Sequence, residues 1–126
     1  MKTSRIAALL VTMAAGGAAL SCGGASAAPL QFRQIEGKHH QTHKYTCSTG
    51  RIVQVTYWDA QNGQSFAVLP VKGTPMLFVN TESASGAKYQ AGSYTWWTKG
   101  PRANLYDMTA GKNAPPLLSD CVTVIR

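Results

Sequence analysis

From Tyr45 onward the chain is a succession of short runs of β-forming residues that are separated by turn residues. The first run, 52–58, alternates so that Val53, Val55 and Tyr57 share one face, as expected of a half-buried strand. The same part of the sequence shows no helical periodicity. Further strands are expected at 66–69, 76–79, 88–90, 93–98, 102–108 and 117–125.

Turn residues and a short length favour an antiparallel sheet that closes on itself. Asn62-Gly63 follows the first run, and this dipeptide tolerates the positive φ angles of a tight hairpin. Pro70 and Gly73 are expected to interrupt the chain before the third run. Seven or eight strands at this spacing predict an antiparallel sandwich or a small barrel. Closure is favoured because about eighty residues cannot cover long exposed sheet edges.

The first 27 residues carry the three parts of an export signal. Met1 to Arg5 holds two positive charges, Ile6 to Leu20 is apolar, and Ala25-Ser26-Ala27 places small residues where a signal peptidase reads them. The apolar run is shorter than the roughly twenty residues that a membrane-spanning helix needs. We therefore expect an exported protein without a stable transmembrane helix.

The chain has three cysteines, and this odd number is explained if Cys22 does not take part in a disulfide. Cys22 ends the segment Ala19-Leu20-Ser21-Cys22, which loosely resembles the lipobox of bacterial lipoproteins, although Leu20 stands one position later than that motif usually has it. Cys22 is then a possible lipidation site. Cleavage after Ala27 would instead remove Cys22 and release a soluble product. Both routes leave two cysteines.

Cys47 and Cys121 lie near the two ends of the expected β region. An exported chain folds where disulfides form, so a bridge between them is the economical expectation. The alternative is two buried free thiols. A loop of this length would gain roughly 4 to 4.5 kcal/mol of stability in the chain-entropy model.

The charge balance suits an acidic partner surface. The chain has 12 lysines and arginines and 5 acids; removing Lys2 and Arg5 with the signal leaves 10 basic residues and a net charge of about +5. Because the basic residues form no run and no basic amphipathic helix is visible, nucleic-acid binding is not favoured. Contact with a membrane is expected only through a lipid on Cys22.

The segment 28–44 is polar and shows neither helical nor strand periodicity, so we expect a flexible tether before a domain at 45–126. His39, His40 and His43 could hold a metal if the segment were helical. A solvated tail is the simpler interpretation, and we predict no metal or cofactor.

The inventory of reactive side chains does not favour an enzyme. Asp59, Glu82, Asp107 and Asp120 are scattered, and the histidines lie in the expected tether. No pair of carboxyl groups and no serine-histidine-acid pattern is visible.

Two turns have the composition of binding loops. Small residues in 82–89 predict an exposed loop between two strands, and Lys99 precedes Gly100-Pro101, so its side chain must point outward near a rim. Ordinary hairpin chemistry would explain both turns equally well. On the same view, Trp96 or Trp97 would be a core residue.

Several short motifs together resemble the bacterial C-type lysozyme inhibitors, over about residues 45 to 125. They are Tyr45-Thr46-Cys47, Ser83-Ala84-Ser85-Gly86-Ala87-Lys88-Tyr89, Trp97-Thr98-Lys99-Gly100, Ala103-Asn104-Leu105 and Cys121. The resemblance implies an eight-stranded antiparallel β-barrel, here closed by one disulfide. Members of this family are either lipid-anchored or periplasmic.

The resemblance also implies a binding site. In the family, the serine and the lysine that match Ser85 and Lys99 reach the active site of lysozyme. Lys88 stands where many members have arginine, which keeps the charge but loses the planar fork. The expected lysozyme-binding residues are Ser83, Ser85, Gly86, Lys88, Tyr89, Lys99 and Gly100.

We therefore expect a non-catalytic inhibitor of a C-type lysozyme. It would be exported to the periplasm of a Gram-negative bacterium, either soluble or anchored by lipid to the outer membrane. The alternative is an envelope protein whose barrel binds a small ligand or has a structural role.

Overall fold

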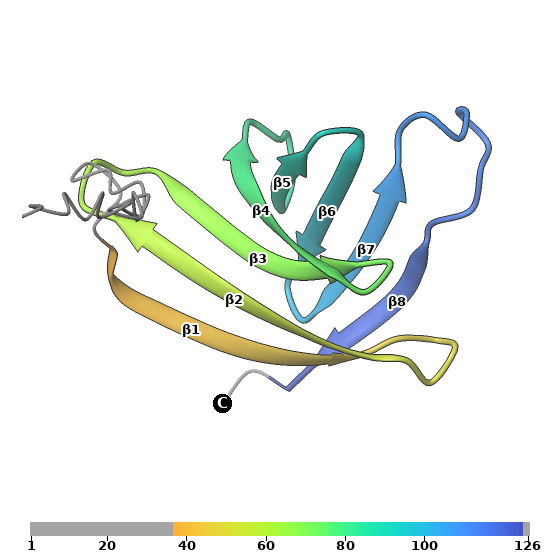
Figure 1. Cartoon of the computed structure of the whole chain (residues 1–126), viewed down its shortest axis with the longest axis horizontal. Helices are drawn as coiled ribbons and strands as arrows, with labels where there is room; N and C mark the ends of the chain where they lie inside the picture. Colours follow the sequence, from red (N-terminus) through yellow and green to blue (C-terminus); the bar gives the residue numbers. More distant parts are fainter. Residues whose placement is uncertain (1–36, 125–126) are drawn as a thin grey trace, which may run out of the picture. The chain divides into compact units, whose positions relative to one another are not determined.

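Residues 37–124 are described by the computed structural model, which is drawn in Figure 1. The expected export signal, Cys22 and residues 28–36 lie outside this range. Among the described residues no helix is long and apolar enough to cross a membrane. The strands are β1 (Gly37–Thr46), β2 (Ile52–Ala60), β3 (Ser65–Val71), β4 (Thr74–Thr81), β5 (Ala87–Ala91), β6 (Tyr94–Lys99), β7 (Arg102–Asp107) and β8 (Leu118–Thr123).

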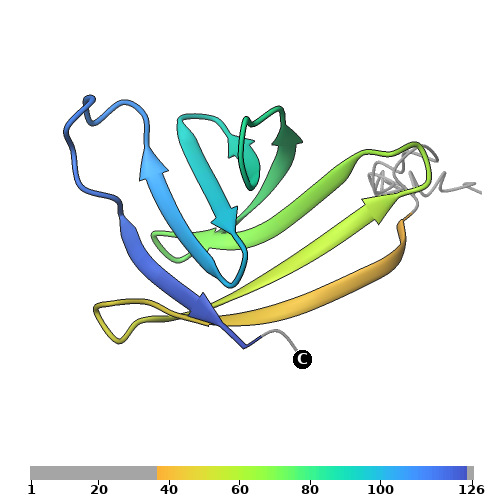
Figure 2. The ribbon, with the colours of Figure 1, turned by 180° about the vertical axis from the view of Figure 1, so that it is seen from behind.

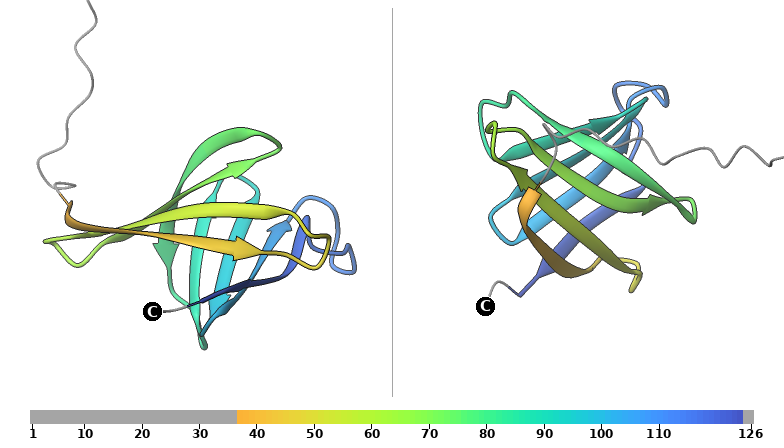
Figure 3. Two further views of the ribbon diagram at one scale, coloured as in Figure 1. Left: turned by 90° about the horizontal axis from the view of Figure 1, so that it is seen from below. Right: turned by 60° about the vertical axis from the view of Figure 1, so that its left-hand side comes forward.

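The eight strands form one closed antiparallel barrel. Each strand pairs with the next along the chain, and β8 returns to pair with β1. Figure 2 shows the same strands from behind, and Figure 3 from two further sides. The predicted fold, a small eight-stranded barrel, is confirmed.

Strand β1 corrects the expected flexible tether over its part 37–44, because the strand begins at Gly37. Its residues His39 to Thr46 pair with β2 without interruption. The alternate positions that precede the buried Tyr45 are Gln41 and His43 rather than apolar residues. A strand with polar side chains on both faces has no period-two signal, so the sequence pattern missed it.

The hairpin at Asn62-Gly63 is confirmed, with Gly63 at a φ of 83°. The expected interruption at Pro70 is wrong, since β3 continues to Val71. Pairing of β3 with β2 ends at Val68, so the missing N–H of Pro70 removes no ladder hydrogen bond on that side. The chain turns instead at Lys72-Gly73, where φ is 49° and 84°, as a two-residue hairpin of type I′ requires.

The inward side chains fill the centre of the barrel. Trp96, Phe78 and Leu69 are fully buried there, as expected for an eight-stranded barrel whose interior is just wide enough for side chains. The predicted inward face of β2 is confirmed. Around these three pack Tyr45, Val53, Val55, Ala67, Val71, Tyr89, Ala91, Ala103, Leu105, Leu118 and the two cysteines.

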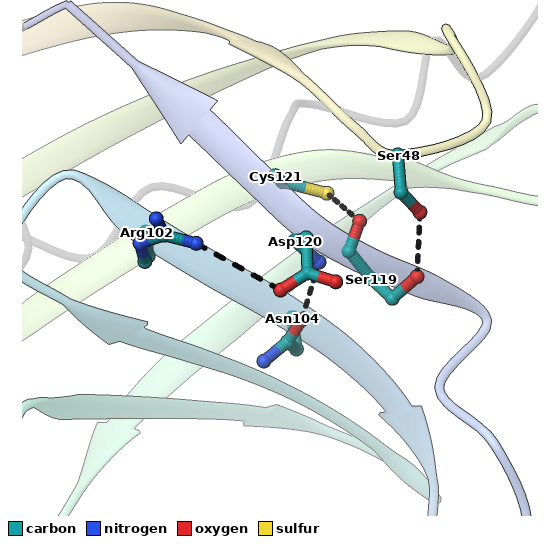
Figure 4. A network of polar contacts seen from close by, with 6 residues as sticks. All are labelled: Ser48, Arg102, Asn104, Ser119, Asp120 and Cys121. Carbon is teal, nitrogen blue, oxygen red and sulfur yellow. Dashed lines mark hydrogen bonds and ion pairs between the residues drawn. The ribbon is translucent and has the colours of Figure 1, made fainter.

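A bulge in β8 sets which of its residues face inward. Between its pairs with β7, β8 has one residue more than β7 does. Asp120 takes a φ of 48° at this point, and its backbone N–H donates to Asn104 Oδ1 at 2.7 Å (Figure 4). Because of the extra residue, Leu118 and Cys121 both point into the core although they are three positions apart.

The barrel closes along a short seam between β1 and β8. Among residues 37–124, two pairs are formed there, Tyr45 with Thr123 and Thr46 with Val122. The disulfide between Cys47 and Cys121 takes the next position of this register, which confirms the expected bridge.

Hydrogen bonds continue the seam past the disulfide. The hydroxyl groups of Ser48 and Ser119 lie 2.8 Å apart, and the Ser48 N–H donates to the Ser119 carbonyl at 3.0 Å. The Cys121 sulfur lies 3.9 Å from that carbonyl oxygen (Figure 4), a contact without a proton because the sulfur is bonded in the disulfide.

Replacing both cysteines, Cys47→Ser with Cys121→Ser, should lower the free energy of unfolding by about 2 to 5 kcal/mol, the usual loss for a small disulfide-closed domain. Urea unfolding followed by tryptophan fluorescence measures the change. Wild-type protein unfolded in a reductant serves as the control and should behave like the double variant. An unchanged midpoint in both would show that the seam holds without the bridge.

Candidate functional site

The two turns singled out in the sequence lie side by side. Strands β5 and β6 pair in a register that sets Ala87 opposite Thr98 and Lys88 opposite Trp97. The loop 82–86 therefore leaves the sheet next to the end of β6, where the side chain of Lys99 is exposed. The structure thus brings the Ser85 loop and the Lys99 turn together.

Gly86 allows the loop to lie directly on β6. A Cβ at this position would stand 2.1 Å from the Thr98 carbonyl oxygen and 2.9 Å from Lys99 Cγ. Its φ of 65° lies in the left-handed region, which also favours glycine. No larger side chain fits without moving the loop away from Lys99.

Hydrogen bonds hold the backbone of the loop and leave the hydroxyl of Ser85 outside. The carbonyl oxygen of Ser85 accepts from Ser83 Oγ at 2.6 Å and from Trp97 Nε1 at 2.9 Å. None of the hydrogen bonds found among the described residues uses the Ser85 hydroxyl. This exposed hydroxyl is therefore available to a partner.

Trp97 also lies beneath two ammonium groups. Lys88 Nζ is 4.2 Å and Lys99 Nζ 4.0 Å from the centre of its ring, within the range of cation–π attraction. Strand alternation puts Trp97 and Lys99 on the same outer face, and the register brings Lys88 beside them. Of the two tryptophans that ordinary hairpin chemistry would place in the core, Trp96 is buried and Trp97 is not; the position of Trp97 two residues before Lys99 was the signal for the outer face.

Tyr89 is set apart from the other predicted contacts. Its side chain points into the barrel, where only 9% of it is exposed, and its ring lies 5.5 Å from that of Tyr57. The remaining predicted residues, Ser83, Lys88 and Gly100, lie with Ser85, Gly86 and Lys99 at the two turns. Within residues 37–124 no three histidine, cysteine or acidic side chains gather as a metal site would require.

These features define a small barrel that presents a hydroxyl and a cation from two adjoining turns held by hydrogen bonds and close contacts, the form of a protein-binding module. The family described as "Membrane-bound lysozyme-inhibitor of c-type lysozyme" matches residues 45–114. A membrane-bound lysozyme inhibitor of C-type lysozyme from Cupriavidus necator is 35% identical over 121 residues, which cover 96% of this chain and 92% of the relative. The chain belongs to this family.

Further relatives agree. The protein of the same name from Pseudomonas aeruginosa is 49% identical over 63 residues, 49% of each chain. Its crystal structure in complex with hen egg white lysozyme matches with a TM-score of 0.58 and 33% identity, covering 79% of this chain and all of that one. The periplasmic lysozyme inhibitor of C-type lysozyme from Salmonella typhimurium matches with a TM-score of 0.60 and 26% identity, covering 69% of this chain and all of that one.

The variant Gly86→Ala should destabilise the fold more than Gly92→Ala. Both glycines have positive φ, but nothing lies within 4 Å of a Cβ at Gly92, so that variant carries only the cost of the left-handed conformation, about 1 kcal/mol. Gly86→Ala adds the collision with the Thr98 carbonyl. Thermal unfolding of the two proteins measures the difference, and equal melting temperatures would show that the loop does not rest on β6.

Proposed function

We propose that the protein inhibits a C-type lysozyme by inserting Ser85 and Lys99 into the active-site cleft. The observation that carries this proposal is the joining of the two turns into one unit by Gly86 and Trp97. Family membership supplies the class of partner, since the relatives are named as inhibitors of C-type lysozyme.

The chemistry of the two side chains suits the two carboxyl groups of such an enzyme. One catalytic carboxyl of lysozyme is kept protonated by an apolar pocket, and the other is ionised. The ammonium of Lys99 is a compact cation for the ionised group. The hydroxyl of Ser85 can both donate to and accept from the protonated one. Occupying both groups would block the sugar cleft without a reaction, so the protein acts as a non-catalytic inhibitor without a cofactor.

The proposed partner also explains why the attraction has to be local. C-type lysozymes are typically basic, and this chain has a net charge of +7, or about +5 once Lys2 and Arg5 are removed with the export signal. Two positively charged proteins approach slowly unless an acidic cleft meets a basic patch. Lys88 and Lys99, gathered over one indole ring, form such a patch.

Export to the periplasm, with or without a lipid on Cys22, fits this function. The relatives are named membrane-bound or periplasmic. In the periplasm a lysozyme would threaten the cell wall. The alternative, a barrel that binds a small ligand in its interior, is less well supported because Trp96, Phe78 and Leu69 fill the centre.

Lys99→Ala should weaken inhibition by roughly thirtyfold to several thousandfold, because losing one partner of a buried charged contact costs about 2 to 5 kcal/mol. Ser85→Ala should weaken it less, since one hydroxyl contact is worth about 1 to 3 kcal/mol. Lys112→Ala, an exposed lysine in the loop between β7 and β8, is the matched charge control. Inhibition of hen egg white lysozyme by the four proteins measures the effects. Parental inhibition by both site variants, at unchanged melting temperatures, would contradict the proposal.

Trp97 is proposed as a positioning residue, and its two functions can be separated. Trp97→Phe keeps a ring beneath the lysines but removes the N–H that donates to Ser85, whereas Trp97→Leu removes both. Hydrogen exchange of the loop 82–86 should therefore accelerate in both variants, and inhibition should fall further in Trp97→Leu. Equal inhibition by the two would show that the ring contributes nothing beyond the hydrogen bond.

A further inference from the structure

The mouth of the barrel beside the Lys99 turn holds an open cavity of about 250 Å³. Thr98 and Gly100, which flank Lys99, form part of its wall. Neither Ser85 nor Lys99 lines it, so it adjoins the proposed inhibitory pair without including it. The other lining residues are Gln41, His43, Tyr45, Tyr57, Asp59, Tyr89 and Thr123.

Aromatic rings and fixed hydroxyl groups form the inner part of this cavity. The hydroxyls of Tyr45 and Tyr57 lie 2.9 Å apart, and Trp96 Nε1 donates to the Tyr57 hydroxyl at 2.8 Å. Burial raises the pKa of Tyr45, Tyr57 and Tyr89 above the ordinary value, so all three are neutral phenols at physiological pH. The cavity therefore offers ring faces and neutral oxygens, with no charge at its base.

Asp59 places a negative charge at the rim. It is the one acid among the lining residues of the described chain, and no lysine or arginine accompanies it there. The alternate positions of β2 before it are Tyr57 and the buried Val55 and Val53, so Asp59 is the exposed outer end of the row that faces the interior.

The carboxylate of Asp59 remains available to a ligand. Ser65 Oγ donates to its Oδ1 at 2.6 Å, and no basic side chain of residues 39–124 lies within 4.0 Å of it. Burial is the main cause of the raised pKa of Tyr89, and the negative charge of Asp59 is the second cause. The electrostatic field of Asp59 therefore reaches Tyr89 across the cavity.

We propose that this cavity receives a cationic side chain, a lysine ammonium or an arginine guanidinium, of the protein partner. A carboxylate beside several phenol rings attracts such a group both by charge and through the ring faces. The inference rests on the proposed function, which places the partner over Ser85 and Lys99. A protein in that position also covers Gly100 and the mouth of the barrel. It gives a basic partner a place on this basic chain where the partner's own positive charge is attracted.

A titration that needs no lysozyme tests the cavity itself. Nα-acetyl-arginine methylamide added to the folded protein should shift the NMR signal of the Trp96 indole N–H, whose acceptor Tyr57 lines the cavity. The citrulline counterpart, which has the same shape without the charge, should not shift it. Asp59→Asn should abolish the shift, and Asp107→Asn, at the far end of β7, should keep it. No shift with the arginine compound, or equal shifts with both compounds, would overturn the proposal.

Inhibition of hen egg white lysozyme tests the cavity in the complex. Asp59→Asn should weaken inhibition roughly tenfold or more, as expected for the loss of a charged hydrogen bond, while Asp107→Asn, with the same change of net charge, should not. If Lys99→Ala abolishes inhibition but Asp59→Asn equals Asp107→Asn, the cavity proposal fails and the proposed function stands. If the wild-type protein inhibits no lysozyme, the proposed function fails, and the arginine titration alone decides the cavity.

Discussion

The disulfide between Cys47 and Cys121 closes the barrel at the seam where its strands pair least. Within the described part of the chain, two residue pairs join β1 to β8 there, whereas β1 and β2 pair along nearly their whole length. Without the bridge, β8 could separate from β1 and open the wall that Thr123 and Tyr45 share at the mouth. The bulge at Asp120 serves the same closure, because it turns Cys121 inward toward its partner. The mouth of the barrel thus depends on a constraint at the first and last strands.

The interior of the barrel changes character along its axis. Leu105 and Val53 pack in an apolar region, Trp96 and Tyr57 follow with their polar atoms satisfied by one another, and Asp59 ends the row at the rim. This order lets one sheet serve two purposes. The apolar region stabilises the fold, while the polar mouth lies next to the turns that a partner would contact.

The sequence predicted the parts whose local signals agree with the fold. Alternation at Val53 and Val55 located β2, and Asn62-Gly63 located a hairpin. The bridge was predicted because Cys47 and Cys121 remain once Cys22 is set aside and lie near the two ends of the β region of an exported chain. The first half of β1 was not predicted, because its inward residues face the polar mouth rather than the core. Asp59 was not predicted as a site residue either, because a single acid in a strand forms no motif. Only closure of the barrel brings it beside aromatic rings from other strands.

The two turns of the site are held before any partner arrives. Gly86 lies on the Thr98 carbonyl, and Trp97 contacts Ser85 and Lys99 at once. Ordering a flexible loop on binding would take up about 0.5 to 1.5 kcal/mol for each immobilised side chain, so a pre-formed pair of turns keeps that free energy for the interface. A barrel of this size has little stability to spare, and it gains the rigid turns from backbone contacts and one indole ring rather than from a larger core. Rigidity at the rim is therefore a consequence of how β5 and β6 pair.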